Sequence, residues 1–450
     1  MLWVARVESV AAELKHIPDY RLYGRVVAVQ GLLVEVAGIE HSVSIGSNLA
    51  LVTRDGRNVP GEVTGFRDDR ALVMPFESLD GIGLGCRAIV VDHDPVAHPD
   101  ASWLGRIVNA LGRPVDGRGP LKMGPTPQAL KACPPLASAR QRVAGKLDLG
   151  VRAINTFLTC CRGQRMGIFS GSGIGKSILM SMMARFTQSD VNVIGLVGER
   201  GREVKEFIED YLGPEGMKRT VIVVATSDES ALMRRQAGYL TLTVAEYFSD
   251  LGLDVLCMID SVTRFAMAQR EIGLSSGEPP ASKGYTPTVF SEMPRLLERA
   301  GPGTGQGTIT GIFTVLVEGD DHNEPIADAV RGILDGHIVL DRAIAERGCY
   351  PAINVLRSVS RTMPACNSPE ENRLVGRARA MIAVYEDMAE MIRLGAYRIG
   401  SDAKIDEAIR YRDQLEAFLG QDKDEACSLD QGYATLAAVI AEKPAPAVRK

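Results

Sequence analysis

A cluster of glycine and serine residues leads directly into a lysine and a second serine at residues 170–177, S-G-S-G-I-G-K-S. Glycines at this spacing let successive backbone N–H groups converge on a phosphate group. The side chain of Lys176 is long enough to reach the outer phosphates of a nucleotide, and the hydroxyl group of Ser177 suits Mg²⁺. Ser170 stands where such a loop usually begins with glycine, but it is small enough for the turn. We predict that ATP is bound by Gly171, Ser172, Gly173, Ile174, Gly175, Lys176, Ser177 and Ile178.

The residues on either side of this loop support the prediction. The segment R-M-G-I-F before it reads as a strand, and S-I-L-M-S-M-M-A-R-F after it reads as an amphipathic helix. A helix that begins at the loop adds the positive end of its dipole to a phosphate site. The plain alternative is a glycine-rich turn that binds nothing. A dinucleotide-binding fingerprint is excluded, because the helix of that motif does not open with Lys-Ser.

Two carboxylates follow other apolar segments. ATP hydrolysis needs such carboxylates, because the attacking water must be oriented and the metal ion must be bound. The segment D-V-L-C-M-I-D ends in Asp260, which we predict to hold Mg²⁺ together with Ser177. The segment V-N-V-I-G-L-V-G-E ends in Glu199, at the carboxyl end of a predicted strand, where parallel sheets bind their ligands. We predict that Glu199 polarises the attacking water. The alternative is a solvated surface glutamate.

A parallel sheet has to position these side chains. Between residues 92 and 365, apolar β-branched segments alternate with helical stretches, which is typical of an α/β domain whose sheet is buried on both faces. The predicted strands are R-M-G-I-F, V-N-V-I-G-L-V, T-V-I-V-V-A-T, D-V-L-C-M-I-D, T-I-T-G-I-F-T-V-L-V and H-I-V-L. From residue 21 to residue 91, short alternating segments separated by Gly, Asp and Asn instead predict a small β-barrel or sandwich.

The amino-terminal residues 1–20 predict a short helix. Its apolar residues fall on one face, at Trp3, Val7, Val10 and Leu14. This face either packs on the rest of the chain or serves as an arm that binds a partner.

Residues 366–440 predict a helical domain. It opens with a capping box at Ser368-Pro369-Glu370-Glu371, and a second helix is expected over roughly residues 403–418. The Pro/Ala-rich residues 441–450 predict a disordered tail.

The composition is that of a globular protein with two or three domains: 450 residues, 45% hydrophobic and 24% charged, with a net charge of -5. The acidic balance gives no reason to expect nucleic acid as a partner. The apolar runs are shorter than the roughly 18 residues that span a bilayer, and the amino terminus carries no secretion signal. The cysteines are scattered along the chain, a pattern that predicts reduced thiols in a cytoplasmic protein. Adjacent Cys160 and Cys161 read as small buried residues rather than a redox pair.

Several segments occur in an order that resembles the hexameric rotary-type ATPases. They are F-S-G-S-G-I-G-K-S, V-G-E-R-G-R-E-V, M-I-D-S-V-T-R-F-A-M-A-Q-R-E-I-G, G-Y-T-P-T-V-F-S-E-M-P-R-L-L-E-R-A-G and Y-P-A-I-N-V-L-R-S-V-S-R. Within the last, P-A-I-N-V-L-R-S-V-S is similar to the diagnostic decapeptide of the α/β subunit superfamily. The chain looks like the type III export ATPases, with the flagellar branch favoured over the virulence branch. The resemblance spans essentially the whole chain. It implies an α/β fold with a P-loop, RecA-like parallel-sheet ATPase core, an N-terminal β-barrel and a C-terminal helical domain.

The same resemblance implies roles for individual residues. Glu199 would be the catalytic carboxylate, assisted by Lys176. Arg200 would be a γ-phosphate or interface charge, and Arg264 would approach the γ-phosphate. Tyr350 would stack on adenine. Arg361 would be an arginine finger given to the neighbouring subunit's site. The plain alternatives are a core aromatic for Tyr350 and a structural ion pair for Arg361.

As a whole, the resemblance implies an ATP-hydrolysing homohexamer at the cytoplasmic face of the inner membrane. Hydrolysis would release chaperones from cargo and deliver the cargo to an export gate. The helix over residues 1–20 would bind a stator or regulatory protein. The Gly/Ser/Pro-rich residues 271–285 would face a central stalk protein at the pore.

Other functions remain open at this point. A subunit of an ATP synthase or vacuolar-type ATPase would need a dissimilar partner chain, and a virulence-type secretion ATPase differs too little to be separated. An RNA-translocating ring would need an N-terminal nucleic-acid-binding domain, which the sequence lacks. A non-catalytic nucleotide-binding subunit is disfavoured by the presence of Glu199.

Overall fold

The computed structural model describes residues 21–91, 95–143, 145–317 and 324–441. The chain divides into two compact units: one runs up to Val96 and adds residues 230–232 and 271–279, and the other holds the remaining residues. The helix predicted over residues 1–20 and the tail predicted beyond Ala441 lie outside the described residues.

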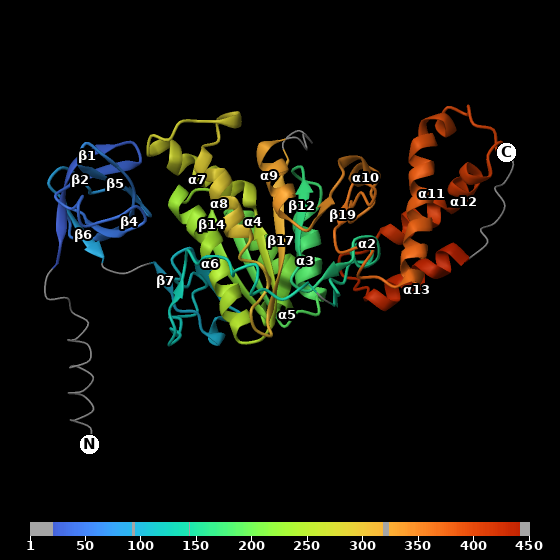
Figure 1. The fold of residues 1–450 in the computed structure, drawn as a ribbon, viewed down its shortest axis with the longest axis horizontal. Helices are drawn as coiled ribbons and strands as arrows, with labels where there is room; N and C mark the ends of the chain where they lie inside the picture. Colours follow the sequence, from blue (N-terminus) through green and yellow to red (C-terminus); the bar gives the residue numbers. More distant parts are fainter. Residues whose placement is uncertain (1–20, 92–94, 144, 318–323, 442–450) are drawn as a thin grey trace, which may run out of the picture. The chain divides into compact units, whose positions relative to one another are not determined.

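The first unit contains a closed β-barrel with the strand order β1-β2-β5-β4-β3-β6, drawn in blue in Figure 1. Inward-facing residues such as Val34, Val36, Val63 and Val73 are fully buried and fill the barrel with β-branched side chains. The barrel is therefore a packed core, as the alternating sequence predicts. Its strands are β1 (Tyr23–Gln30), β2 (Leu33–Ala37), β3 (Asn48–Val52), β4 (Asn58–Arg67), β5 (Arg70–Pro75) and β6 (Arg87–Val91).

The described part of the second unit holds a nine-stranded sheet with the order β19-β18-β12-β17-β15-β13-β14-β8, with β16 paired to β17. Its strands are β8 (Ile107–Asn109), β12 (Arg165–Ser170), β13 (Val191–Glu199), β14 (Thr220–Thr226), β15 (Asp254–Asp260), β16 (Gly301–Pro302), β17 (Thr308–Leu316), β18 (Gly336–Val339) and β19 (Val359–Ser360). All pairs from β18 to β8 are parallel, whereas β16 and β19 pair antiparallel. The predicted strands are confirmed, and the short edge strands β8 and β19 are additions that the sequence pattern did not predict.

Helices follow most strands of this sheet (Figure 1). They are α2 (Arg152–Phe157), α3 (Lys176–Phe186), α4 (Gly201–Glu206), the π-helix η2 (Phe207–Leu212), α5 (Gly213–Met217), α6 (Ala231–Asp250), α7 (Val262–Ser275), α8 (Pro287–Leu297), α9 (Pro325–Ile333) and α10 (Arg342–Glu346). Short 3-10 helices occupy η1 (Ala101–Trp103) and η3 (Ser282–Gly284). Two small sheets pair β7 (Val96–Ala97) with β9 (Gln128–Ala129) and β10 (Lys146–Leu147) with β11 (Cys160–Cys161).

The parallel pairing brings three strand ends together. Leu196 of β13 pairs with Asp260 of β15, and Ser170 of β12 pairs with Leu316 of β17, which lies between β12 and β15. Because parallel strands end at the same edge, the glycine-rich loop, Glu199 and Asp260 all meet there. The sheet thus places the glycine-rich loop, Glu199 and Asp260 at one edge, as the sequence predicts.

The carboxyl-terminal helices are α11 (Pro369–Arg393), α12 (Ala403–Leu419) and α13 (Leu429–Ala441), drawn in orange and red in Figure 1. The predicted capping box is confirmed: the backbone N–H of Ser368 donates to Glu371 Oε2 at 2.6 Å, and the Glu371 N–H donates to Ser368 Oγ at 3.2 Å. Helix α13 is a third helix that the prediction did not include. No described helix is long and apolar enough to cross a membrane.

One apolar core joins these helices to the sheet. It includes Met166 of β12, Phe157 of α2, Phe418 of α12 and Leu436 of α13. The rings of Phe157 and Phe418 meet edge to face, with their centroids 6.3 Å apart. Since the core is continuous, the boundary between an ATPase domain and a helical domain stays a prediction.

Cys160 and Cys161 lie side by side in β11, where they are 1% and 3% exposed. Burial raises the pKa of the Cys160 thiol to about 12, so this thiol stays protonated. The predicted burial of this pair is confirmed.

Candidate active site

The phosphate loop joins the end of β12 at Ser170 to the start of α3 at Lys176. Gly173 and Gly175 have φ angles of 77° and 91°, in the left-handed region that residues with a Cβ atom avoid. A Cβ atom at Gly175 would also lie 3.4 Å from the ring of Tyr350. Glycine is therefore needed for the turn at both positions, because both have a positive φ, and the distance to Tyr350 is an ordinary van der Waals contact.

The residues of the phosphate loop differ in whether their side chains are exposed to the cleft. All those predicted to bind the nucleotide line the cleft described below, except Ile174. Ile174 is 1% exposed and packs in the apolar core, so it can offer only its backbone to a phosphate. Ser170 is 1% exposed as well, as expected for a small residue at the turn from the strand into the loop.

Lys176 lies between two carboxylates. Its Nζ atom contacts Oδ1 of Asp260 and lies 3.5 Å from Oε1 of Glu199. Burial would lower the pKa of Lys176, but the two carboxylates outweigh burial and hold this pKa above its ordinary value. Lys176 is therefore charged, and a phosphate group can replace either carboxylate as its partner.

Glu199 ends β13 directly after Gly198, whose φ angle is 71°. A Cβ atom at Gly198 would lie 2.8 Å from Cβ of Arg264, so glycine lets α7 approach the strand end. Burial, followed by repulsion from Asp260, raises the pKa of Glu199 to about 7, and Lys176 opposes this rise. A carboxyl group that titrates near neutral pH is suited to act as a general base.

Two arginines and one tyrosine complete the site. Arg264 of α7 has a buried Nε atom without a hydrogen-bond partner among the described residues, which suits a group that binds an anion. The Arg200 side chain is 80% exposed, and its Nη1 atom lies 2.9 Å from Oε1 of Glu203. Tyr350 is 46% exposed beside Gly175, so it is no core aromatic.

These residues line a cleft of about 750 Å³, a volume in the range of ligand pockets. Its lining also includes Glu203, Glu206, Tyr211, Ser227, Thr263, Met267, Leu316, Val317 and Arg342. Asp260 reaches the cleft through its contact with Lys176. Within the described ranges, no three His, Cys, Asp or Glu residues cluster as a metal site. Mg²⁺ does not need such a cluster, because this ion is usually held by one or two protein groups and substrate phosphates, so the assignment of Ser177 and Asp260 to Mg²⁺ stays a prediction.

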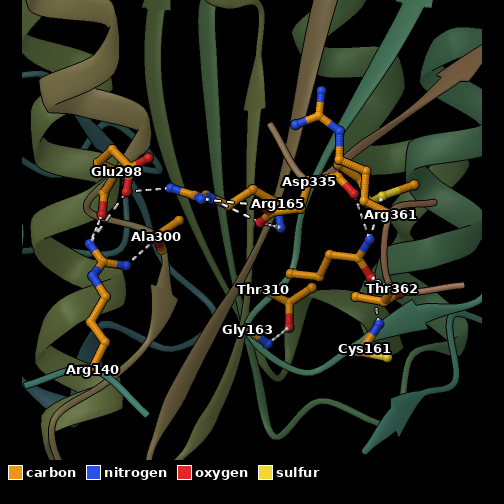
Figure 2. A network of polar contacts seen from close by, with 12 residues as sticks. Arg140, Cys161, Gly163, Arg165, Glu298, Ala300, Thr310, Asp335, Arg361 and Thr362 are labelled. Atoms are coloured by element: carbon orange, nitrogen blue, oxygen red, sulfur yellow. Dashed lines mark hydrogen bonds and ion pairs between the residues drawn. The ribbon is translucent and has the colours of Figure 1, made fainter. Parts of the chain in front are cut away.

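Arg361 is not among the residues that line this cleft. It follows the edge strand β19, where its backbone N–H donates to the Asp335 carbonyl at 2.9 Å and its Nη2 atom donates to the Arg331 carbonyl at 3.3 Å. Figure 2 shows Arg361 beside Asp335, which is also held by the guanidinium of Arg165 through bonds of 3.0 and 3.1 Å. Arg165 also forms an ion pair with Glu298, in which Nη1 lies 2.5 Å from Oε2. The network holds the backbone that carries Arg361 and leaves this residue exposed.

Two polar residues contact the site although no sequence motif predicts that they do. Arg342 donates from Nη2 to the carbonyl of Ser172 at 3.2 Å. Thr314 of β17 donates from its hydroxyl group to Oδ1 of Asp260 at 2.7 Å. Both contacts depend on how distant segments pack, which no local pattern encodes.

Known proteins share this arrangement of domains. Residues 150–360 match the nucleotide-binding domain of the ATP synthase alpha/beta family, and residues 26–89 match the β-barrel domain of that family. Residues 367–438 match the C-terminal domain of the type III secretion ATPase EscN. The flagellum-specific ATP synthase of Caulobacter vibrioides is 56% identical over 440 residues, which cover 96% of this chain and 99% of that protein. The chain belongs to the flagellar and type III secretion ATPases of the ATP synthase alpha/beta family.

Other members of these export ATPases are similar over nearly their whole length. The type 3 secretion system ATPase of Xanthomonas euvesicatoria is 46% identical, with 96% of this chain and 97% of that protein covered. The solved structure of assembled EscN from enteropathogenic E. coli has a TM-score of 0.88 at 39% identity and covers 93% of this chain and 100% of that chain. The resemblance and the fold class predicted from the sequence are confirmed, and this member of the family is an ATPase.

Proposed function

We propose that this chain is the ATP-hydrolysing subunit of a flagellar type III export apparatus. The observation that carries the proposal is the meeting of Lys176, Glu199 and Asp260 at one sheet edge, in a chain with the C-terminal helices of an export ATPase. The flagellum-specific relative at 56% identity, against 46% for the type 3 secretion relative, favours the flagellar branch over the virulence branch.

The residues of the cleft have distinct tasks in this proposal. The backbone N–H groups of the loop and the ammonium group of Lys176 bind the β- and γ-phosphates. Tyr350 stacks on adenine, Arg264 approaches the γ-phosphate, and Arg200 serves as a γ-phosphate or interface charge. Glu199 orients the attacking water and polarises it. Bound Mg²⁺, held by Ser177 and Asp260, supplies charge neutralisation on the phosphates.

The position of Arg361 outside its own cleft is compatible with a ring of identical chains. Since this arginine lies outside the cleft of its own chain, we propose that it completes the cleft of a neighbouring copy in a homohexamer. A finger supplied in this way is worth about 10³ to 10⁵ in rate. The solved EscN structures support an oligomer, because they are of the assembled ATPase, one of them with its central stalk EscO. We propose that a stalk protein likewise meets residues 271–285.

Further partners and the site of action follow the family resemblance. We propose a stator or regulatory protein at residues 1–20, and chaperones, cargo and the export gate at the C-terminal helices. The protein would act in the cytoplasm, at the cytoplasmic face of the inner membrane. We propose domains over residues 1–20, 21–91, 92–365 and 366–440, followed by a tail over 441–450.

Steady-state phosphate release by the purified chain tests this proposal. Glu199→Gln should lower the turnover number by about 10² to 10⁴, the usual contribution of a general base, while ATP affinity is kept. Glu209→Gln, at a side chain that is 62% exposed, is the matched control and should keep full activity. If the purified chain binds ATP without turnover, it needs a dissimilar partner, and an ATP synthase-type subunit becomes the better function. Deletion in the parent organism should abolish motility, and retained motility would contradict the flagellar assignment.

A further inference from the structure

A buried hydroxyl group lies behind the Asp260 carboxylate. Thr314 is the seventh residue of β17, it stands between Phe313 and Val315 in the sequence, and its side chain is fully buried. Valine would fill such a place in a buried parallel strand equally well. A buried hydroxyl group needs a hydrogen-bond partner, and Thr314 finds one in Oδ1 of Asp260 at 2.7 Å.

The pairing of two strands fixes this contact. In the parallel register, Ile259 of β15 pairs with Phe313 of β17, so the next residues on each strand, Asp260 and Thr314, come side by side. Thr314 Oγ1 lies 3.5 Å from the carbonyl oxygen of Ile259, so Oδ1 of Asp260 at 2.7 Å is the nearer acceptor for its single proton. The donor is thus held by the sheet itself.

Oδ1 of Asp260 accepts from two donors, Lys176 and Thr314. These donors differ in what else they can do. Lys176 belongs to the phosphate loop and is needed by a nucleotide, so it has to exchange partners. Thr314 sits in the sheet and has no such task. Oδ2 of Asp260 has no hydrogen bond to any described residue, which leaves this oxygen for a further ligand.

We propose that Thr314 is the positioning residue of the metal-binding carboxylate: its hydroxyl group holds Oδ1 of Asp260 while Lys176 moves to phosphate, and so leaves Oδ2 available to ligate Mg²⁺. The inference rests on the proposed function, because it assigns a metal to Asp260. Hydrogen bonds to a ligating carboxylate fix its orientation, and their loss typically costs about 10–100-fold in metal affinity or activity.

Binding of a fluorescent ADP analogue tests the proposal without turnover. The measured quantity is the ratio of the Kd in EDTA to the Kd in saturating Mg²⁺, which reports how strongly the metal supports the nucleotide. Thr314→Val should lower this ratio by about 10-fold while the Kd in EDTA stays as in the wild type. Thr314→Ser, which restores the hydroxyl group, should restore the ratio. Thr314→Ala is measured beside Thr314→Val, in case the valine variant fails to fold.

The same strand offers a matched control. Thr310 of β17 is also buried, but its hydroxyl group accepts from the backbone N–H of Gly163 at 2.9 Å. Thr310→Val should therefore leave the ratio unchanged, whatever it does to the melting temperature. An unchanged ratio in both Thr314→Val and Thr314→Ala would overturn the proposal. So would a loss of EDTA binding in these variants that serine does not restore, since that marks a structural role. A wild-type chain whose binding ignores Mg²⁺ would overturn the proposed function itself.

Discussion

Lys176 and Asp260 form an ion pair that ties the first residue of α3 to the last residue of β15, 84 residues further along the chain. The same ammonium group lies 3.5 Å from Glu199, and the three side chains are 11%, 5% and 16% exposed in the order Lys176, Asp260 and Glu199. Water therefore screens these charges little. Binding of a phosphate exchanges one anionic partner of Lys176 for another, which avoids the cost of burying a new lone charge.

Replacing Lys176 with alanine should weaken ATP binding and also destabilise the fold. A hydrogen bond to a charged group is worth about 1.5–3 kcal/mol, which corresponds to roughly 10- to 100-fold in Kd. The variant also leaves two buried carboxylates without their counter-charge, so we expect a lower melting temperature. Equilibrium nucleotide binding and thermal unfolding measure the two effects.

Lys205→Ala is the control for this variant, because Lys205 is 73% exposed and lies 3.9 Å from Glu209 at the surface. Surface pairs contribute about 0–1 kcal/mol, so both measurements should match the wild type. ATP binding that survives Lys176→Ala unchanged would show that the loop does not use this lysine.

Glu199 predicts a pH dependence of stability. Its pKa is about 7 in the folded chain against an ordinary 4.5, because burial and Asp260 disfavour the carboxylate. The stability that its neutral form contributes is fully present below pH 4.5 and is lost as the pH rises through about 7. The glutamine in Glu199→Gln cannot ionise. The melting temperature of this variant should therefore rise relative to that of the wild type as the pH increases from 4.5 to about 7. Melting curves of the nucleotide-free protein measure the gap, and a gap that is constant with pH would refute the assignment. Glu209→Gln should show no such trend.

Gly173 and Gly175 are both required by the backbone of the phosphate loop. Both have a positive φ, so an alanine at either costs about 1–2 kcal/mol of backbone strain. A Cβ atom at Gly175 would lie 3.4 Å from the ring of Tyr350, an ordinary van der Waals contact, and nothing lies within 4 Å at Gly173. We therefore expect Gly173→Ala and Gly175→Ala to weaken ATP binding by similar factors, as titration with a fluorescent ATP analogue would measure. A much larger loss in Gly175→Ala would show that crowding against Tyr350 adds to the backbone strain.

The sequence predicts most of the sheet and the centre of the site, for a physical reason. Continuous apolar runs such as residues 193–197 and 255–259 favour burial on both faces, so the strands and their central place in the sheet follow from composition. A charged residue at the end of such a run, as at Glu199 and Asp260, must then lie at the edge of the sheet.

Other parts of the structure depend on packing that no local pattern records. The edge strands β8 and β19 are too short to show a period, and α13 forms where its apolar face meets α2 and α12. The contact of Thr314 with Asp260 follows from the β15–β17 register. Ile174 reads as part of the phosphate loop, yet its side chain is in the core.

A mixing experiment tests most directly whether identical chains share their sites. Arg361→Ala keeps its own cleft but has no finger to give, and Glu199→Gln keeps the finger but has no base. Each should be nearly inactive by itself. In rings formed from an equal mixture, about one quarter of the sites pair an intact cleft with an intact neighbouring finger, so ATPase activity should return to that order.

Arg373→Ala, at a side chain that is 76% exposed, is the control for loss of an arginine and should remain active by itself. The ATPase activity of the mixture should lie well above the sum of the activities of its two components. A mixture that assembles into rings but hydrolyses no more ATP than its components would contradict the central claim that Arg361 acts on the neighbouring copy.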